Sequence, residues 1–335
     1  MKIGLQRFTF FLDQLQNLFA EAATQKNPAL WLYANNARTP LFMLEGLSKL
    51  YGDLHNKKKF SKLKMHFKLL EDAIGAIDYY DSVTKEFEKN KKIPATVINY
   101  LQAQTREKIQ YLNELLVEEK WLGVDKLRVG KIQKKLLKVD WLNEEKEITA
   151  IQEFYGKSIY EILEFLRTKQ YRFDNMELDV HELRRKLRWL SIYPQAMKGS
   201  IQLGANKASP QHLKKYLTKE IVNSPYNVMP EVGTATCFLM LEKKYFLSLS
   251  WMIADLGKLK DSGLNVIALK EALQQTSALK ETACLNKAYQ LLGNTKEKIP
   301  VLLNKATATC KLFIKEQNLE NMLMGIKLAK KLNTE

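Results

Sequence analysis

The sequence is poor in the residues that interrupt helices. Among its 335 residues there are only 14 glycines and 8 prolines. Residues that favour helices, above all leucine, lysine, glutamate, glutamine and alanine, are abundant instead. The composition therefore predicts a nearly all-helical protein, and a hydrophobic content of 46% is enough for a sizeable buried core.

Cysteine is scarce, and its spacing argues against two common uses. The chain has 3 cysteines, an odd number, without any CxxC pair. This pattern argues against a disulfide framework and against a cysteine zinc site, and it fits a reducing compartment best. The three residues are Cys237, Cys284 and Cys310.

Long apolar segments and familiar catalytic motifs are missing. No stretch reaches the roughly 18 apolar residues of a membrane span, and the apolar run at 8–12 is too short for a signal peptide. We therefore expect a soluble cytoplasmic protein. The GxGxxG, P-loop and HExxH motifs are absent, and His55, His66 and His212 have no second ligand at zinc spacing. We predict no metal, no cofactor and no catalytic residue.

Charge is strongly unbalanced. Lysine and arginine number 53 against 37 acidic residues, which gives a formal net charge of +16. Such a chain attracts an anionic partner, which could be nucleic acid, a phosphate polymer, an acidic protein or an anionic membrane face. Only nine of the basic residues are arginines, so most of the positive field comes from scattered lysines.

Segment 179–191 contains three of the nine arginines, all within five consecutive positions. On a helix, at about 100° per residue, the side chains of His181, Arg184, Arg185 and Arg188 fall within an arc of roughly 100°, beside a separate apolar stripe. Arginine suits planar, bidentate recognition of phosphate or carboxylate oxygens, so the segment predicts an anion-binding helix face. The alternative is a solvated basic face with acidic neighbours as partners. Those neighbours are Asp179 and Glu182.

Apolar periodicity predicts helices along most of the chain. The expected helices cover residues 6–23, 30–54, 58–87, 95–122, 126–137, 143–154, 158–170, 179–193, 235–259, 268–292 and 301–331. Residues 171–178 form a polar connector, and 198–234 is the most loop-like region apart from a short helix near 212–222. Lys57, Lys64 and Lys68 line up on one flank of helix 58–87, as an extension of the cationic surface or as solvated residues.

A short sequence recurs near the ends of two long expected helices. It reads I-G-A-I-D at 74–78 and L-G-K-L-K-D at 256–261. Each copy follows a lysine-bearing helix, and before each of these lies a helix with arginine, at Arg38 in the first half and at Arg184 in the second. The same order of elements in both halves favours an internal duplication.

These residues resemble the conserved histidine α-helical domain, the CHAD family. Its signature is a helix reading His-x-x-Arg-x-x-x-Lys/Arg, followed by a Leu-Gly-x-x-x-Asp helix end, with the whole unit present twice. The second copy is matched by His181, Arg184 and Arg188, and its helix end by Leu256, Gly257, Lys260 and Asp261. The first copy looks degraded, because Asn35 stands in place of histidine while Phe42 and Met43 replace basic residues. Residues 58–81 resemble the long helix and helix end of this first copy. Arg38 is the cation that remains on its histidine helix.

The resemblance implies an all-α fold of two pseudo-symmetric antiparallel helical bundles around a basic central cavity. The bundles would be residues 1–175 and 176–335, together forming one CHAD-like domain. It also implies binding of inorganic polyphosphate in that cavity. The degraded first copy leaves open how strongly its half contributes.

We therefore predict a non-enzymatic protein that binds inorganic polyphosphate or a similar phosphate-rich polyanion. The residues predicted to bind it are His181, Arg184, Arg185, Arg188, Arg38, Lys57, Lys64 and Lys68. One alternative is nucleic-acid binding, for which Trp189 beside Arg188 and Tyr155 near Lys157 are the only aromatic hints. Another is a helical scaffold without a small ligand. Oligomeric state stays open.

Overall fold

The computed structural model describes residues 2–123, 127–205, 210–233, 235–293 and 297–328. It is mainly α-helical, as the sequence predicts, with one small sheet. The helices are α1 (Ile3–Ala22), α2 (Pro28–Ala34), α3 (Arg38–Leu54), α4 (Lys57–Glu88), α5 (Ala95–Glu118), α6 (Leu127–Leu137), α7 (Glu144–Thr168), α8 (Glu182–Ala196), α9 (Lys219–Val222), α10 (Lys243–Thr276), α11 (Glu281–Leu292) and α12 (Ile299–Lys315). Short 3-10 turns lie at Gln211–Tyr216, Pro225–Asn227 and Glu320–Met322.

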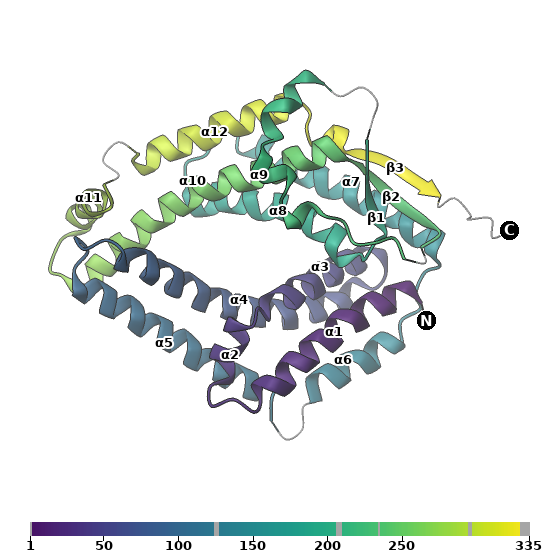
Figure 1. Ribbon diagram of the computed structural model, residues 1–335, viewed down its shortest axis with the longest axis horizontal. Coiled ribbons are helices and arrows are strands. Elements are labelled where there is room, and N and C mark those ends of the chain that lie inside the picture. The colour runs from purple at the N-terminus through teal and green to yellow at the C-terminus, as the bar shows by residue number, and fades with distance from the viewer. Residues whose placement is uncertain (1, 124–126, 206–209, 234, 294–296, 329–335) are drawn as a thin grey trace.

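Two long helices, α4 and α10, organise the molecule. In Figure 1, α4 runs through the lower half of the molecule and α10 through the upper half. Helix α3 contacts α4, and α8 contacts α10. Asparagine caps start α4 and α7: the side chain of Asn56 accepts a hydrogen bond from the backbone of Lys59, and that of Asn143 from Lys146. Because α7 is continuous, the two helices predicted over 143–170 are in fact one, and Gly156 does not interrupt it.

Both halves of the sequence contribute to each of two hydrophobic clusters. The larger joins side chains from the first half, such as Phe8 and Phe67, to side chains from the second, such as Phe246 and Phe313. The smaller lies where the far ends of α4, α5, α10 and α11 meet, at the left of Figure 1. The bundles predicted for the two halves therefore do not enclose separate cores.

A buried polar network also connects the two halves. The Arg7 guanidinium on α1 donates to Glu147 on α7 over 2.6 Å and to the Ser200 hydroxyl over 2.6 Å. Its Nε donates to the Met197 carbonyl over 3.1 Å, and the Tyr51 hydroxyl donates to Glu147 over 2.7 Å. Burial alone would lower the pKa of Arg7, but the charges and hydrogen bonds of Tyr51 and Glu147 raise it. Arg7 therefore stays charged, because its donors have partners.

The sheet corrects two predicted helices. Strands β1 (Ile201–Gly204), β2 (Cys237–Glu242) and β3 (Leu323–Leu328) lie in the order β1-β2-β3, the first pair parallel and the second antiparallel. The predictions for 235–259 and 268–292 are wrong at their boundaries, because α10 begins at Lys243 and runs unbroken to Thr276, and α11 follows only from Glu281. The prediction for 301–331 is wrong at its end, because α12 ends at Lys315. A short apolar run such as 237–242 fits a buried strand or a helix equally well, so pairing with β1 and β3 decides.

The start of the arginine helix also differs from the prediction. A π-helical segment, Met176–His181, precedes α8, so the predicted connector 171–178 is shorter than expected. At its other end α8 continues through Pro194 to Ala196, although the sequence predicts that Pro194 stops it. Proline has no N–H for the carbonyl of residue 190, and the buried Tyr155 hydroxyl donates to that Leu190 carbonyl instead. The helix therefore continues without a buried unpaired acceptor.

Candidate functional site

The helices α3 and α8 bring arginines from both sequence halves to one aromatic ring. The guanidinium carbon of Arg188 lies 4.3 Å from the centroid of the Phe42 ring, and that of Arg38 lies 5.2 Å from it. Cations at these distances are attracted to the ring face. Both arginines therefore contact the ring of Phe42.

Arg38 is held by two carboxylates of α4. Its Nε donates to Glu71 over 2.6 Å, and its Nη1 donates to Asp78 over 2.9 Å. Burial raises the pKa of the Glu71 carboxyl, and the charge and hydrogen bond of Arg38 oppose that rise. The guanidinium packs so closely on Gly75 that a Cβ there would lie 2.7 Å from Arg38 Nη2. Arg38 is thus tied down within its own half.

Arg184 makes a comparable contact in the second half. Its Nε donates to the Ile253 carbonyl of α10 over 3.1 Å, and a Cβ on Gly257 would lie 3.0 Å from the same nitrogen. Burial lowers the pKa of Arg184, and the charge of Asp261 acts in the opposite direction. The repeated sequence at 74–78 and 256–261 therefore coincides with a repeated contact, in which an arginine of the shorter helix lies over a glycine of the long one.

Arg188 differs from both. Its side chain is half-buried and, within the described part of the chain, has no carboxylate at ion-pair distance and no carbonyl as an acceptor. Burial lowers its pKa first, and the charges of Arg184 and Arg38 lower it further, while Glu71 opposes them. The structure thus places three predicted site residues close enough to repel one another, with the middle one unpaired.

The other predicted residues of α8 and its approach have local partners. His181 bonds through Nδ1 to Glu177 over 2.8 Å, and the exposed Arg185 pairs with Glu182 over 2.6 Å. Glu182 therefore neutralises Arg185, as the alternative reading of the segment supposes. Asp179 does not reach the arginines.

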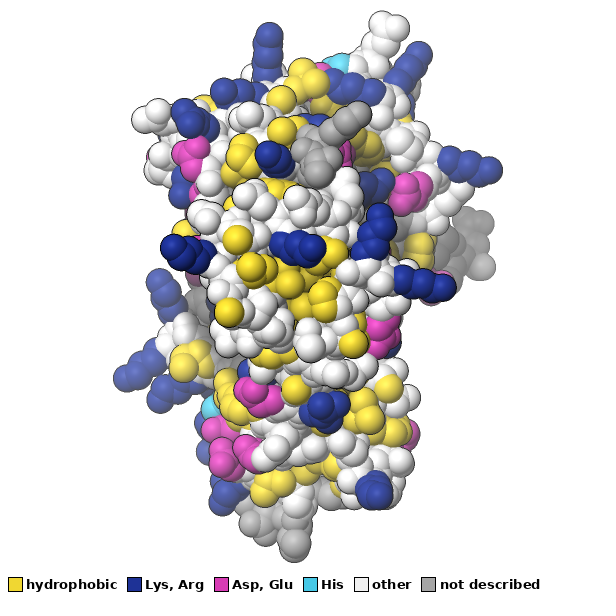
Figure 2. Space-filling view, turned by 90° about the vertical axis from the view of Figure 1, so that its left-hand side faces the viewer, with side chains coloured by type: hydrophobic (Ala, Val, Ile, Leu, Met, Phe, Trp, Pro, Cys, Tyr) yellow, Lys and Arg dark blue, Asp and Glu magenta, His cyan; other side chains and the backbone are white. Residues whose placement is uncertain are grey.

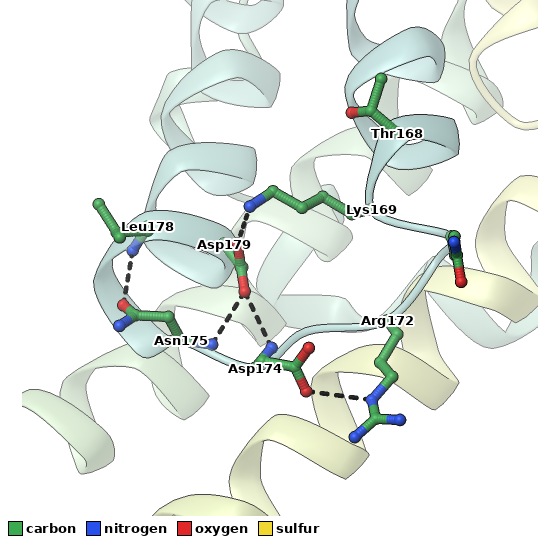
Figure 3. A pocket seen from close by; sticks show the side chains of 8 residues that line it. Thr168, Lys169, Arg172, Asp174, Asn175, Leu178 and Asp179 are labelled. Carbon is green, nitrogen blue, oxygen red and sulfur yellow. Dashed lines mark hydrogen bonds and ion pairs between the residues drawn. The ribbon is translucent and has the colours of Figure 1, made fainter.

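Asp179 instead stabilises the turn that leads into the π-helical segment, as Figure 3 shows. It accepts from the backbone of Asp174 over 2.9 Å and of Asn175 over 2.8 Å, and lies 2.7 Å from Lys169 Nζ. Burial would raise the pKa of its carboxyl, but these hydrogen bonds and the charge of Lys169 lower it. A cavity of about 460 Å³ lies here, lined by Lys169, Arg172 and their neighbours, and it contains none of the predicted site residues.

The predicted lysines of α4 are divided. Lys57 lies at the exposed start of the helix, and Lys68 pairs with Asp72 over 2.6 Å. Lys64 is half-buried and close enough to Glu45 on α3 to lower the pKa of that carboxyl. Of the three lysines, only Lys64 and Lys68 therefore face the region between α3 and α4.

Two residues near this region, Glu45 and Lys49, were not predicted from the sequence. Glu45 is only 3% exposed, and burial raises its pKa to about 7 against the opposing charge of Lys68. One turn further on, burial lowers the pKa of Lys49, and its ammonium lies 5.8 Å from the Trp189 ring centroid. The sequence did contain a sign of Glu45, because a carboxylate there interrupts the apolar residues of 41–50.

The aromatic residues considered for nucleic-acid stacking are occupied in packing. Tyr155 is fully buried. Trp189 stacks on Tyr193 at 6.0 Å and lies against Gly46, where a Cβ would be 3.2 Å from the indole. These two residues therefore give no support to a single-strand binding surface.

Basic residues are scattered on one further face of the molecule. On the face formed around α11 and the ends of α4 and α5, Figure 2 shows lysine and arginine side chains singly among hydrophobic and acidic ones. Among the described residues no group of three or more His, Cys, Asp or Glu side chains could hold a metal ion. In the same part of the chain no helix combines the length and apolarity that crossing a bilayer requires.

The protein is mainly α-helical, and Arg38, Arg184 and Arg188 lie near one another where α3 and α8 meet α4 and α10. Comparison of the chain with protein-family models, with curated proteins and with solved structures gives no match. Membership of the CHAD family therefore stays a prediction.

Proposed function

We propose that this protein binds inorganic polyphosphate or a similar phosphate-rich polyanion, without catalysis, at a site built from Arg38, Arg184 and Arg188. The observation that carries the proposal is the state of Arg188. Its guanidinium is half-buried beside two other arginines and has no ion-pair partner among the described residues. A bound anion would supply that partner and relieve the repulsion among the three cations.

The finer expectations belong to the same proposal. They are membership of the CHAD family, an internal duplication, a basic central cavity and a cytoplasmic location. The repeated arginine–glycine contacts at Gly75 and Gly257 support the duplication. The net charge of +16 supports attraction of an anion but does not select polyphosphate over nucleic acid.

Calorimetric titration at one fixed salt concentration tests the proposal with three ligands: polyphosphate, single-stranded DNA and double-stranded RNA. We expect polyphosphate to bind most tightly. We expect Arg188→Gln to weaken its binding about tenfold or more, because a charge-assisted contact contributes about 1.5 to 3 kcal/mol.

The matched control is Arg167→Gln, which removes one positive charge from an exposed position on α7 where Arg167 pairs with Glu164 over 2.6 Å. It should bind like the unmodified chain. Equal losses in the two variants would show that net charge alone attracts the ligand. Tightest binding of either nucleic acid would favour that alternative instead.

A further inference from the structure

The cationic surface around Arg188 ends abruptly on the α3–α4 side. Arg38 is bonded to two carboxylates, Glu71 and Asp78, so these three side chains together carry a formal negative charge. A phosphate chain that ran from Arg188 over Arg38 would meet these oxygens. Repulsion between them and the chain would offset the attraction of Arg38.

The lysines of α4 do not restore a continuous track. Lys68 is paired with Asp72, and Lys64 lies beside the buried Glu45, whose charged form is favoured by both lysines. Cations and carboxylates therefore alternate along this wall, which is the surface formed by α3 and α4. Such a wall has little net attraction for a long polyanion, since each phosphate meets charges of both signs.

Phe42 limits the site from the same side. Its ring lies against the guanidinium groups of both Arg188 and Arg38. An apolar ring offers no hydrogen bond to a phosphate oxygen. It supports the flat face of Arg188 and leaves the N–H groups at the edge of the guanidinium to bind a ligand.

The unused donors are therefore concentrated on one helix. Arg184 and Arg188 are one turn apart on α8, a spacing at which side chains are neighbours. Arg184 uses Nε for the Ile253 carbonyl and, among the described residues, has no partner at its two terminal nitrogens. Two adjacent guanidinium groups can both bond to one phosphate group that has several free oxygens. They fit such a group better than a row of phosphate units that each carry a single charge.

We propose that Arg184 and Arg188 bind a terminal phosphate group, so that a polyphosphate chain is held by its end and not along its length. This inference rests on the proposed function. A terminal phosphate carries about 1.5 to 2 negative charges near pH 7 and three free oxygens, whereas an internal unit of the chain carries one charge. Short phosphates and phosphate monoesters present the same group.

The experiment compares pyrophosphate, tripolyphosphate, a long polyphosphate, and the same long chain with both ends capped as phosphoramidates, by calorimetry at one salt concentration and pH. End binding predicts that affinity per molecule is nearly constant from tripolyphosphate to the long chain. It also predicts that capping weakens binding about tenfold or more, because one charge-assisted contact is lost. In Arg188→Gln the difference between capped and uncapped chains should disappear, while Arg167→Gln should retain it.

The outcomes separate this inference from the proposed function. Affinity that rises with chain length and ignores capping would overturn end binding and leave polyanion binding intact. Absence of binding to all four phosphates would reject both. Pyrophosphate or tripolyphosphate binding as tightly as the long uncapped chain, with weak binding of the capped one, would support end binding.

Discussion

Arg184 lies directly over Gly257, with its Nε 3.0 Å from the point where a Cβ atom of residue 257 would stand. The long helix α10 can approach α8 this closely only where it lacks a side chain. The same relationship holds between Arg38 and Gly75, at 2.7 Å from Nη2. The position of each arginine therefore depends on a glycine that is remote in the sequence.

Replacing this glycine should disturb the site more than the fold. In Gly257→Ala the new methyl group crowds Arg184 Nε, which must shift by a few tenths of an ångström, so we expect its hydrogen bond to the Ile253 carbonyl to weaken. We expect anion affinity to fall about fivefold, the equivalent of about 1 kcal/mol. Stability should change by less than about 1 kcal/mol, because alanine favours the helix by about that amount. Gly156→Ala on α7, where nothing lies within 4 Å, is the control and should leave affinity unchanged.

The two arginines that contact glycine should differ in their effects. Arg184→Ala removes a cation with free donors, so we expect a larger loss of anion affinity than in Arg38→Ala. Arg38→Ala should chiefly lower stability, by about 1 to 3 kcal/mol, because Glu71 is 4% exposed and would lose its partner. Titration with tripolyphosphate and urea unfolding of both variants measure the two effects. Equal affinity losses would contradict the asymmetry of the site.

Salt should weaken the complex, but only moderately. If two guanidinium groups hold one phosphate terminus, the slope of log K against log salt concentration should be about −1 to −2, by analogy with about one unit per neutralised phosphate. Affinities measured between about 50 and 200 mM salt give this slope. A slope several units steeper would indicate contacts along a long chain and would contradict end binding.

Tyr155 should contribute to stability through the proline in α8. In Tyr155→Phe the Leu190 carbonyl, which Pro194 cannot bond, loses its donor. We expect a loss of about 1 to 3 kcal/mol, the cost of a buried acceptor without a partner. The control is Tyr160→Phe on the same helix, where Tyr160 is 60% exposed, and it should be neutral. Thermal or urea unfolding compares the two.

Glu45 should make stability fall as pH rises. Its pKa is raised from 4.5 to about 7 by burial, so the folded state holds this proton more tightly than the unfolded state. The resulting stabilisation is complete below the unfolded pKa and is lost as pH rises to the folded one. Glu45→Gln should therefore gain stability relative to the unmodified chain between pH 5 and pH 8, by up to about 3 kcal/mol.

Urea unfolding of both proteins at these two pH values measures this gain. The other groups around position 45, namely Lys64, Lys68, Glu71 and Asp72, are present in both proteins, so the comparison isolates the effect of Glu45. The same difference in stability at both pH values would show that Glu45 titrates normally. Exposed Glu153→Gln provides the control.

Much of the helical architecture could be predicted from the sequence. The stripe of Leu183, Leu187 and Leu190, for example, is buried as its spacing indicates. Prediction from apolar periodicity was wrong where a short apolar run fits a strand or a helix, as at β2. It was also wrong where a residue distant in the sequence allows a helix to continue past a proline. At Pro194 that residue is Tyr155 on α7, which lies 35 positions before the Leu190 carbonyl that it bonds.

The sequence by itself determined which residues are cations and which helix faces are apolar, because both follow from residue type and spacing along one helix. Only the tertiary structure decided which cations are free. Arg38, Arg184 and Arg185 are alike in sequence, yet Arg38 meets Glu71 and Asp78, Arg185 meets Glu182, and Arg184 meets a backbone carbonyl. Arg188 meets Phe42 from a helix 146 positions away. Partners of a side chain depend on the packing of elements distant in the chain, and no local spacing records that packing.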